Sequence, residues 1–508
     1  MKRYKIDRTL FGLLVAVLFA FSCESLEEQP LGFESSANTF QSIENFEGLV
    51  TGATRTLQQI DYYGLTASSQ DLETSPEFDT YSYAPGSGTF ASLWSSSYKA
   101  INGLNAVIEN IDLAENGNQS QTDKILGKAY FLRAFAYFNM IRFFGDVPLV
   151  LSGSSSLDEI GVDQGRTPSI DVYAQIIDDL EEAEGLLPGS ALPGEPTKGA
   201  AMAYLSKVYL TMAGAPLKLT ENYAKAAAKA KQIIDAETYS LGDYTDNLFA
   251  SLQNSSNSII FQFIHSTEAG SSYSNGLFER TSFRNGITNP GSRTWKRFMD
   301  NFPDGPRKEA IFYMNSDPVV ANFLNEKDAN GNFSNEAFRI VNNIGEVNER
   351  KYFLKESQEV GLIKKYTYGS EGPEGSLSDQ NTVMFRYAEV LLIYAEAQNM
   401  ADNGANQLAY DALNEVRVRG LGAGTELAFG SLSTSEFDDE IIKERYWEFG
   451  FEMKRWFDVL RKQIPLTFDV YTAGVYEEFN AAFPTRYLFP IPQREMDLND
   501  NLTQNDGY

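Results

Sequence analysis

The sequence contains one cysteine and one histidine in 508 residues, and each scarcity excludes a class of chemistry. With Cys23 as the only thiol, the chain cannot form an internal disulfide bond. One imidazole, His265, and one thiol are too few for a zinc site built from several His and Cys ligands. The same count excludes catalytic machinery that needs more than one imidazole. We therefore expect no resident metal and no cofactor.

Positive charge is also scarce. The chain has 42 Lys and Arg residues against 69 Asp and Glu residues, which gives a net charge of −27 at pH 7. Such an acidic chain repels nucleic acid and anionic lipid head groups, so nucleic-acid binding is not an expected function. Hydrophobic residues make up 43% of the chain and aromatic residues 13%, which is enough to bury the core of a globular protein.

Long apolar runs are limited to one, residues 10–21, which follows a basic head at residues 2–8. Because a bilayer span needs about 20 apolar residues, this run is too short to cross a membrane. It predicts instead a secretory signal peptide over residues 1–22.

The signal peptide ends at Ser22-Cys23, which resembles the lipobox of bacterial lipoproteins, although Ala20 stands where that pattern prefers Leu. We expect Cys23 to be lipidated and residues 23–40 to form a lipidated tether. An unmodified thiol in a cleaved leader is the alternative. Lipidation would add several acyl chains, and two or more chains anchor a protein stably where one holds weakly.

Apolar residues recur at helical spacing along most of the mature chain. The spacing predicts helices at about 43–61, 94–108, 126–145, 168–187, 198–213, 221–236, 384–397, 405–419 and 435–460. Helices joined by short connections resemble tetratricopeptide repeats, without a clean 34-residue period. We therefore predict an all-α fold, a tetratricopeptide-like helical scaffold with irregular, partly extended insertions.

Residues 241–380 lose the helical period and are rich in Asn, Ser, Gly and aromatic residues. The stretch 328–332 invites a calcium-binding interpretation, but Phe333 stands where an EF-hand loop needs Gly, so we expect a turn. We divide the mature chain into an N-terminal helical region (41–240), an irregular ligand-binding region (241–380) and a C-terminal helical region (381–508).

Two polar residues fall on apolar helix faces. Asn105 is expected to be a satisfied core amide. Arg133 must have a carboxylate or carbonyl partner if it is buried, and we expect a structural pair rather than a ligand contact.

Glu448 and Glu452, four residues apart on a predicted helix, could imitate the paired carboxylates of a retaining glycosidase. Basic neighbours such as Arg445 would lower their pKa values, whereas a general acid needs a raised pKa. We therefore expect ion pairs there, and we interpret Glu389 and Glu396 in the same way.

Five segments resemble, in order, the SusD/RagB family of nutrient-uptake lipoproteins. They are residues 127–149, 197–210, 386–396, 444–458 and 488–508. The resemblance extends from Cys23 to Tyr508. It implies about four tetratricopeptide-like units, a lipid anchor in the outer membrane facing the cell surface, and a SusC-like TonB-dependent transporter as partner. It also implies capture of a glycan, or in some members of a peptide, without catalysis.

Sugar recognition needs flat apolar faces together with planar polar groups. Three tryptophans fall on predicted helices at core spacing, so Trp295, in the irregular region, is the predicted stacking platform. Further predicted ligand contacts are Tyr62, Tyr63, Tyr81, Tyr83, Tyr273, Arg284 and Asn285. The predicted function is glycan capture for a transporter; a peptide ligand, a lipid-anchored glycosidase and a helical interaction scaffold are the alternatives.

Overall fold

The computed structural model describes most of the helical part of the chain. The described residues are 40–62, 65, 72–73, 83–153, 164–242, 244, 257–266, 283–284, 287–288, 293–294, 298, 301–313, 362–363, 365, 381–464, 466–472, 475–481 and 487–508. The leader, Cys23, the tether and the stretch 328–332 lie outside them, so the predictions made there stay predictions.

Helices dominate the described residues. They are α3 (Ile43–Gln58), α6 (Gly88–Asn110), the 3-10 helix η1 (Ile111–Leu113), α7 (Gln119–Phe144), α8 (Ser169–Leu186), α9 (Lys198–Ala213), α10 (Asn222–Asp235), α13 (Pro306–Ile311), α17 (Tyr387–Ala401), α18 (Gln407–Leu421), α19 (Thr434–Glu448), α20 (Arg455–Lys462) and α21 (Gln493–Leu498). The all-α prediction is confirmed. None of these helices is both long enough and apolar enough to cross a membrane.

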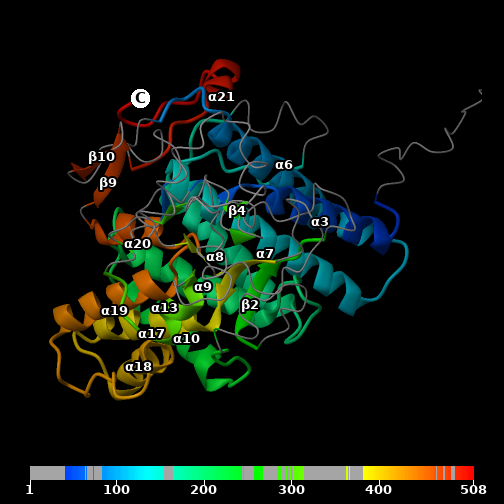
Figure 1. Cartoon of the computed structure of the whole chain (residues 1–508). Helices are drawn as coiled ribbons and strands as arrows, with labels where there is room; N and C mark the ends of the chain where they lie inside the picture. The colour runs from blue at the N-terminus through cyan, green and yellow to red at the C-terminus, as the bar shows by residue number, and fades with distance from the viewer. Residues whose placement is uncertain are drawn as a thin grey trace, which may run out of the picture.

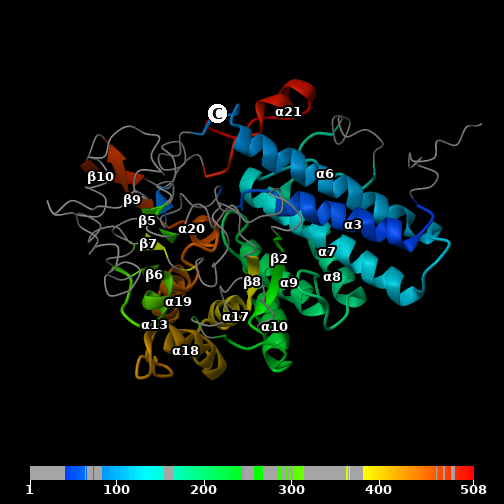
Figure 2. The ribbon, with the colours of Figure 1, turned by 45° about the vertical axis from the view of Figure 1, so that its right-hand side comes forward.

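Consecutive helices pack side by side, each against its predecessor in the chain. The series runs from α3 through α6, α7, α8 and α9 to α10 (Figures 1 and 2). Helix α10 then packs directly on α17, although residues 236–386 separate the two in sequence, and α17 packs on α18 and α19. The scaffold is thus one continuous helical array, and the irregular middle of the chain is inserted between two of its neighbours.

The described strands are short and form antiparallel pairs. The pairs are β1 (Leu72–Glu73) with β5 (Arg293–Thr294), β2 (Ile259–Phe263) with β8 (Thr382–Arg386), β3 (Phe283–Arg284) with β4 (Ile287–Thr288), β6 (Phe312–Tyr313) with β7 (Leu362–Ile363), and β9 (Leu466–Thr472) with β10 (Val475–Ala481). Strand β8 runs directly into α17, which places Arg386 at the junction between sheet and scaffold.

Aromatic side chains join the helices to the rest of the core. Phe131 of α7 meets Tyr204 of α9 and Phe261 of β2 edge to face, with ring centroids 5.3 and 4.9 Å apart. Each such pair adds about 0.5–1.5 kcal/mol beyond the burial of apolar area. Near the C-terminus, Phe489 stacks on Phe143 at 5.1 Å. The end of the chain therefore closes over the N-terminal helices, where Figure 1 shows α21 beside α6.

The helix predicted for residues 435–460 is wrong in two respects. The pattern Ser435-x-x-Asp438 predicts a capping box at its start, but the capping box in the structure is formed by Ser433 and Glu436, two residues earlier. The helix also breaks after α19, because Phe451 has a φ of 67° and Gly450 lies against Phe298. A Cβ at Gly450 would come within 2.8 Å of that ring.

Candidate functional site

Two of the predicted ligand contacts are buried in the core. Tyr62 and Tyr83 are 5% and 3% exposed. Tyr62 packs edge to face against Phe135, and Tyr83 packs in the same way against Phe90 and Phe489. In this structure neither ring presents the open face on which a sugar would stack.

Of the other predicted contacts, only Arg284 lies among the described residues. Arg284 lies on the short strand β3. Five predicted contacts, Trp295, Tyr63, Tyr81, Tyr273 and Asn285, lie outside the described residues. Their roles stay predictions.

The polar residues on apolar helix faces have the predicted structural roles. Arg133 donates to both carboxylate oxygens of Asp179, at 2.8 and 2.7 Å, and to Oδ1 of Asn105 at 2.8 Å. Asn105 in turn donates to the carbonyl oxygen of Val150 at 3.0 Å. These contacts confirm Arg133 as part of a structural pair and Asn105 as a satisfied core amide.

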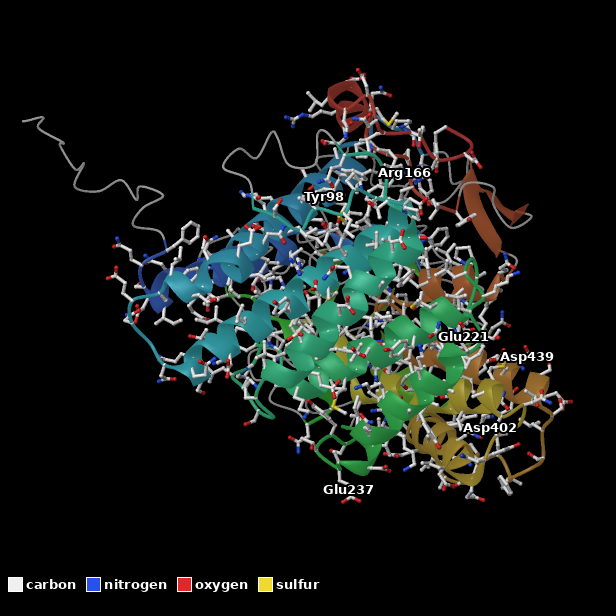
Figure 3. All side chains as sticks on the ribbon, turned by 180° about the vertical axis from the view of Figure 1, so that it is seen from behind. Tyr98, Arg166, Glu221, Glu237, Asp402 and Asp439 are labelled. Atoms are coloured by element: carbon white, nitrogen blue, oxygen red, sulfur yellow. The ribbon has the colours of Figure 1, made fainter. Side chains whose placement is uncertain are left out.

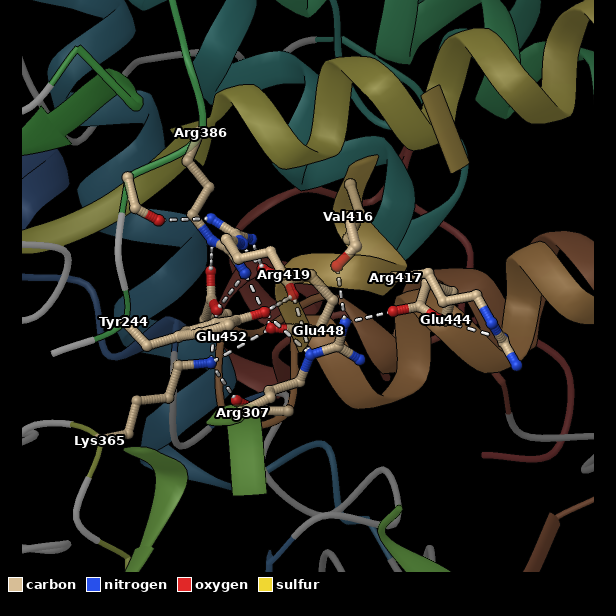
Figure 4. A network of polar contacts seen from close by, with 12 residues as sticks. Tyr244, Arg307, Lys365, Arg386, Val416, Arg417, Arg419, Glu444, Glu448 and Glu452 are labelled. Atoms are coloured by element: carbon tan, nitrogen blue, oxygen red, sulfur yellow. Dashed lines mark hydrogen bonds and ion pairs between the residues drawn. The ribbon is translucent and has the colours of Figure 1, made fainter. Parts of the chain in front are cut away.

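Glu448 and Glu452 belong to a buried ionic network, which Figure 4 shows from close by. Glu448 is the last residue of α19, and Glu452 lies in the turn that follows. Arg386 holds both: its Nε donates to Glu452 at 2.7 Å and its Nη1 donates to Glu448. Arg419 of α18 and Arg307 of α13 also contact Glu448, at 2.5 and 3.1 Å. The network thus ties α13, from the irregular region, to the helical scaffold.

These cations determine the protonation state of the two carboxylates. Burial acts to raise the pKa of Glu448, but Arg386, Arg419 and Arg307 together hold that pKa well below its usual range. For Glu452, Arg386 and Lys365 likewise outweigh burial and lower the pKa. Since a general acid needs a raised pKa, this pair does not suit glycosidase chemistry. The prediction of ion pairing is confirmed, but not its predicted partner, because Arg445 pairs with Asp458 instead.

Glu389 and Glu396 of α17 are also fully buried in ion pairs. Glu389 lies 2.9 Å from Lys207 and 3.1 Å from Lys454, and Arg461 donates to both oxygens of Glu396. In each case burial alone would raise the carboxyl pKa, and the neighbouring cations lower it instead. Both carboxylates therefore stabilise the helical packing as anions.

Within the described part of the chain, no group of three or more His, Cys, Asp or Glu side chains is placed to hold a metal ion. His265 has structural contacts: its Nε2 lies 2.9 Å from Oγ1 of Thr382, and its Nδ1 lies 3.3 Å from Nε2 of Gln58. The histidine therefore links the end of β2 to β8 and α3.

A cavity of about 420 Å³ opens between the ends of α7 and α9, the helix α20 and the last residues of the chain. We call it the C-terminal cavity. Its volume falls in the range of small-ligand pockets, about 300–1,000 Å³. The lining includes three aromatic rings and several planar polar groups. The rings are Tyr173, Phe457 and Tyr487, and the polar groups are Arg142, Asp146, Arg166, Arg461, Gln463, Gln504, Asn505 and Asp506.

Two arginines of the C-terminal cavity make no salt bridge with any described residue. The guanidinium of Arg142 lies between the rings of Phe138 and Phe457, 4.0 and 3.7 Å from their centroids. Burial lowers the pKa of Arg142 to about 10. Arg166 donates instead to neutral oxygens, including the side chain of Asn505, and Figure 3 shows it close to the C-terminal segment. The cavity thus combines aromatic faces with planar donors.

Two family models match the chain. One, described as "SusD family", matches residues 278–508, and the other, described as "Starch-binding associating with outer membrane", matches residues 47–210. The chain belongs to the SusD family.

Relatives and solved structures agree with membership of the SusD family. "SusD-like protein P2" of Formosa agariphila is 28% identical over the full length of both chains. A SusD superfamily protein from Parabacteroides distasonis is 26% identical, with a TM-score of 0.71 over 92% of this chain and 99% of that one. A SusD-like carbohydrate binding protein from Bacteroides fragilis is 19% identical and also has a TM-score of 0.71. The match spans 92% of this chain and 100% of that one, and it shows a shared fold.

Proposed function

We propose that this protein is a surface-exposed lipoprotein that captures an oligosaccharide or polysaccharide and delivers it to a SusC-like TonB-dependent transporter in the outer membrane. Its membership of the SusD family is the observation that carries the proposal. One matching family model is described as starch-binding, and one fold neighbour is named a carbohydrate binding protein. Lipidation of Cys23 would supply the membrane anchor.

The chemistry of the C-terminal cavity supports a ligand rich in hydroxyl groups. Tyr487, which is partly exposed, offers aromatic surface for the C–H face of a sugar ring, whereas Tyr173 is 6% exposed and packs against Phe138. Of the three arginines that line the cavity, Arg461 is already paired with Glu396 and Asp458. The other two make no salt bridge with a described residue, and Asp146 and Asp506 in the same lining balance their charge. This balance fits an uncharged glycan. The predicted platform at Trp295, with Arg284 and Asn285 nearby in sequence, is a second candidate locus.

Affinity electrophoresis in gels that contain purified polysaccharides tests glycan binding and locates it. We expect at least one polysaccharide to retard the protein. Trp295→Ala and Tyr487→Ala compared in the same gel decide between the two loci. Phe429→Ala is the control, because Phe429 is 57% exposed and does not line the C-terminal cavity. Retardation unchanged in both test variants would exclude both loci, and binding of basic peptides alone would favour the peptide alternative.

Purification of the tagged protein from outer membranes in mild detergent tests the partnership. We expect a TonB-dependent barrel to copurify in about equal amount. A preparation that binds glycan but contains no barrel would contradict the delivery role and leave glycan capture standing.

A further inference from the structure

A cluster of buried charges lies behind the C-terminal cavity, and we call it the Glu389 cluster. Three cations share the one carboxylate of Glu389: Lys207 at 2.9 Å, Lys454 at 3.1 Å and Arg445 at 3.7 Å. The four side chains come from α17, α9, the turn before α20 and α19, and each is 12% exposed or less. One carboxylate cannot neutralise three cations.

The surrounding groups do not remove this excess of positive charge. Asp458 accepts from Arg445 at 2.9 Å, but it is shared with Arg461, which also donates to Glu396. Over the cluster and the groups that face it, six cations stand against four carboxylates. They are Arg142, Lys207, Arg445, Lys454, Arg461 and Lys462 against Glu389, Glu396, Asp438 and Asp458. The count takes Lys207 as protonated; burial lowers the pKa of Lys207 well below its usual value, and an anion beside it would favour the protonated form. Uncompensated charge in a protein interior is costly.

A small cavity of about 20 Å³ lies inside the cluster. A water molecule needs roughly 10–15 Å³ of such space, so the cavity has room for one small ion or water. Five of the six cations line it, with only Glu389 and Asp458 opposing them. Arg445 contributes a buried Nη1 that has no hydrogen-bond partner in the described part of the chain, and Arg445 itself is 4% exposed. Room, donors and positive charge therefore coincide.

We propose that this cavity binds one small monovalent inorganic anion such as chloride. The ion accepts hydrogen bonds from Arg445 and from the ammonium groups of Lys207 and Lys454, and it halves the formal excess of two positive charges. The cations that surround it belong to α7, α9, α19, the turn before α20 and the last turn of α20, so the ion stabilises the junction between the two helical regions. It takes no part in glycan binding. The rival arrangement is a water molecule beside a deprotonated Lys207.

Bromide substitution tests the proposal most directly. Crystals of the full chain grown in sodium bromide are measured at the bromine absorption edge. We expect an anomalous peak inside the cavity, between Arg445 and the two lysines. Density for water alone at that position would overturn the proposal.

Thermal unfolding supplies an independent test in solution. The full chain is unfolded in sodium chloride and in sodium gluconate of equal ionic strength, because gluconate is too large for the cavity. If the anion is present at about fifty times its Kd, linkage predicts a Tm about 2 °C higher in chloride. Lys207→Met should abolish this difference. Lys229→Met removes a lysine of α10 that pairs with Glu184 of α8 and does not line the small cavity, so this variant should retain the difference.

Each result of the salt comparison and of the variants either supports or contradicts anion binding in this cavity. Equal Tm values in the two salts would contradict anion binding. A chloride effect that persists in Lys207→Met would place the ion elsewhere and overturn the assignment. If Lys207→Met fails to fold, the bromide map of the unmodified chain still decides the question.

Discussion

Buried cations and carboxylates in this protein form groups in which each charge has several partners. Glu448 is contacted by Arg386, Arg419 and Arg307, all of them largely buried. Removing one member of such a group leaves the others charged and without compensation, which costs about 3–5 kcal/mol. Exposed pairs contribute about 1 kcal/mol or less. Single substitutions within these groups should therefore lower the free energy of unfolding more than substitutions in exposed pairs.

The Arg133–Asp179 pair gives a matched test of this contrast. We expect Asp179→Asn to lower the free energy of unfolding by about 3 kcal/mol, because it leaves the buried guanidinium without its carboxylate. Asp235→Asn makes the same change in an exposed pair with Lys231 and should cost less than about 1 kcal/mol. Urea unfolding of both variants measures the difference, and equal losses would contradict the buried role of Asp179.

Glu448 makes stability depend on pH. The folded pKa of Glu448 lies below its usual value of 4.5. The unfolded chain therefore binds more protons as the pH falls through this range, and the stabilisation present above pH 4.5 is lost. Glu448→Gln should be less stable at pH 7 and should lose less stability than the unmodified chain between pH 6 and pH 3. Glu182→Gln, at an exposed position on α8, is the control. Parallel pH profiles for Glu448→Gln and the unmodified chain would refute this account.

The role of a residue could be predicted from the sequence when it followed from the free-energy cost of burying an unpaired charge. It could not be predicted when it depended on contacts with distant parts of the chain. The need of Arg133 for a partner follows from its place in an apolar stripe, whereas Asp179 as that partner does not. Tyr62 and Tyr83 were predicted to bind ligand because they lie off the helical period. Both are buried, since irregular backbone can pack into a core as tightly as a helix.

The helices follow the apolar spacing of the sequence closely, because each buries one face against the next. Where an element ends was less predictable. At the break between α19 and α20, Gly450 packs against Phe298, about 150 residues earlier in the chain, a contact that no local pattern predicts. The C-terminal cavity was missed for a similar reason: its walls come from five separate segments, and none of them carries a local signature of ligand binding.

The start of α19 offers a test at the scale of one element. Ser433 accepts a hydrogen bond from the backbone of Glu436, whose side chain accepts in return from the backbone N–H of Ser433. Ser433→Ala should therefore cost about 1 kcal/mol of stability. Ser435→Ala, two residues on and exposed, should change stability by less than about 0.5 kcal/mol. Urea unfolding that ranks the two variants in the opposite order would contradict the assigned cap.

Across the whole molecule, charge is divided between outside and inside. Exposed carboxylates such as those labelled in Figure 3 lie at the periphery: Glu221, Glu237, Asp402 and Asp439. The Glu389 cluster behind the C-terminal cavity has the opposite sign. An acidic exterior keeps the protein soluble and repels anionic surfaces, while the interior can hold a small anion. The array of helices carries both features, and the irregular region is inserted into it between α10 and α17.

The predicted anchor is separable from the folded part of the chain. Cys23→Ser should release the protein from the membrane fraction, because no acyl chains can then be attached. Polysaccharide binding should persist, since the tether precedes the first described helix. Ser25→Ala, beside the predicted anchor, should remain with the membranes. Membrane fractionation followed by affinity electrophoresis measures both properties. Loss of binding in Cys23→Ser would show that anchor and binding fold are not independent.

Titration calorimetry of the purified protein with the oligosaccharides of the retarding polysaccharide, followed by mass spectrometry of the same sample, tests the central claim most directly. The account predicts saturable binding of a glycan that is recovered intact. Absence of binding to every glycan, or recovery of shortened chains with new reducing ends, would contradict it.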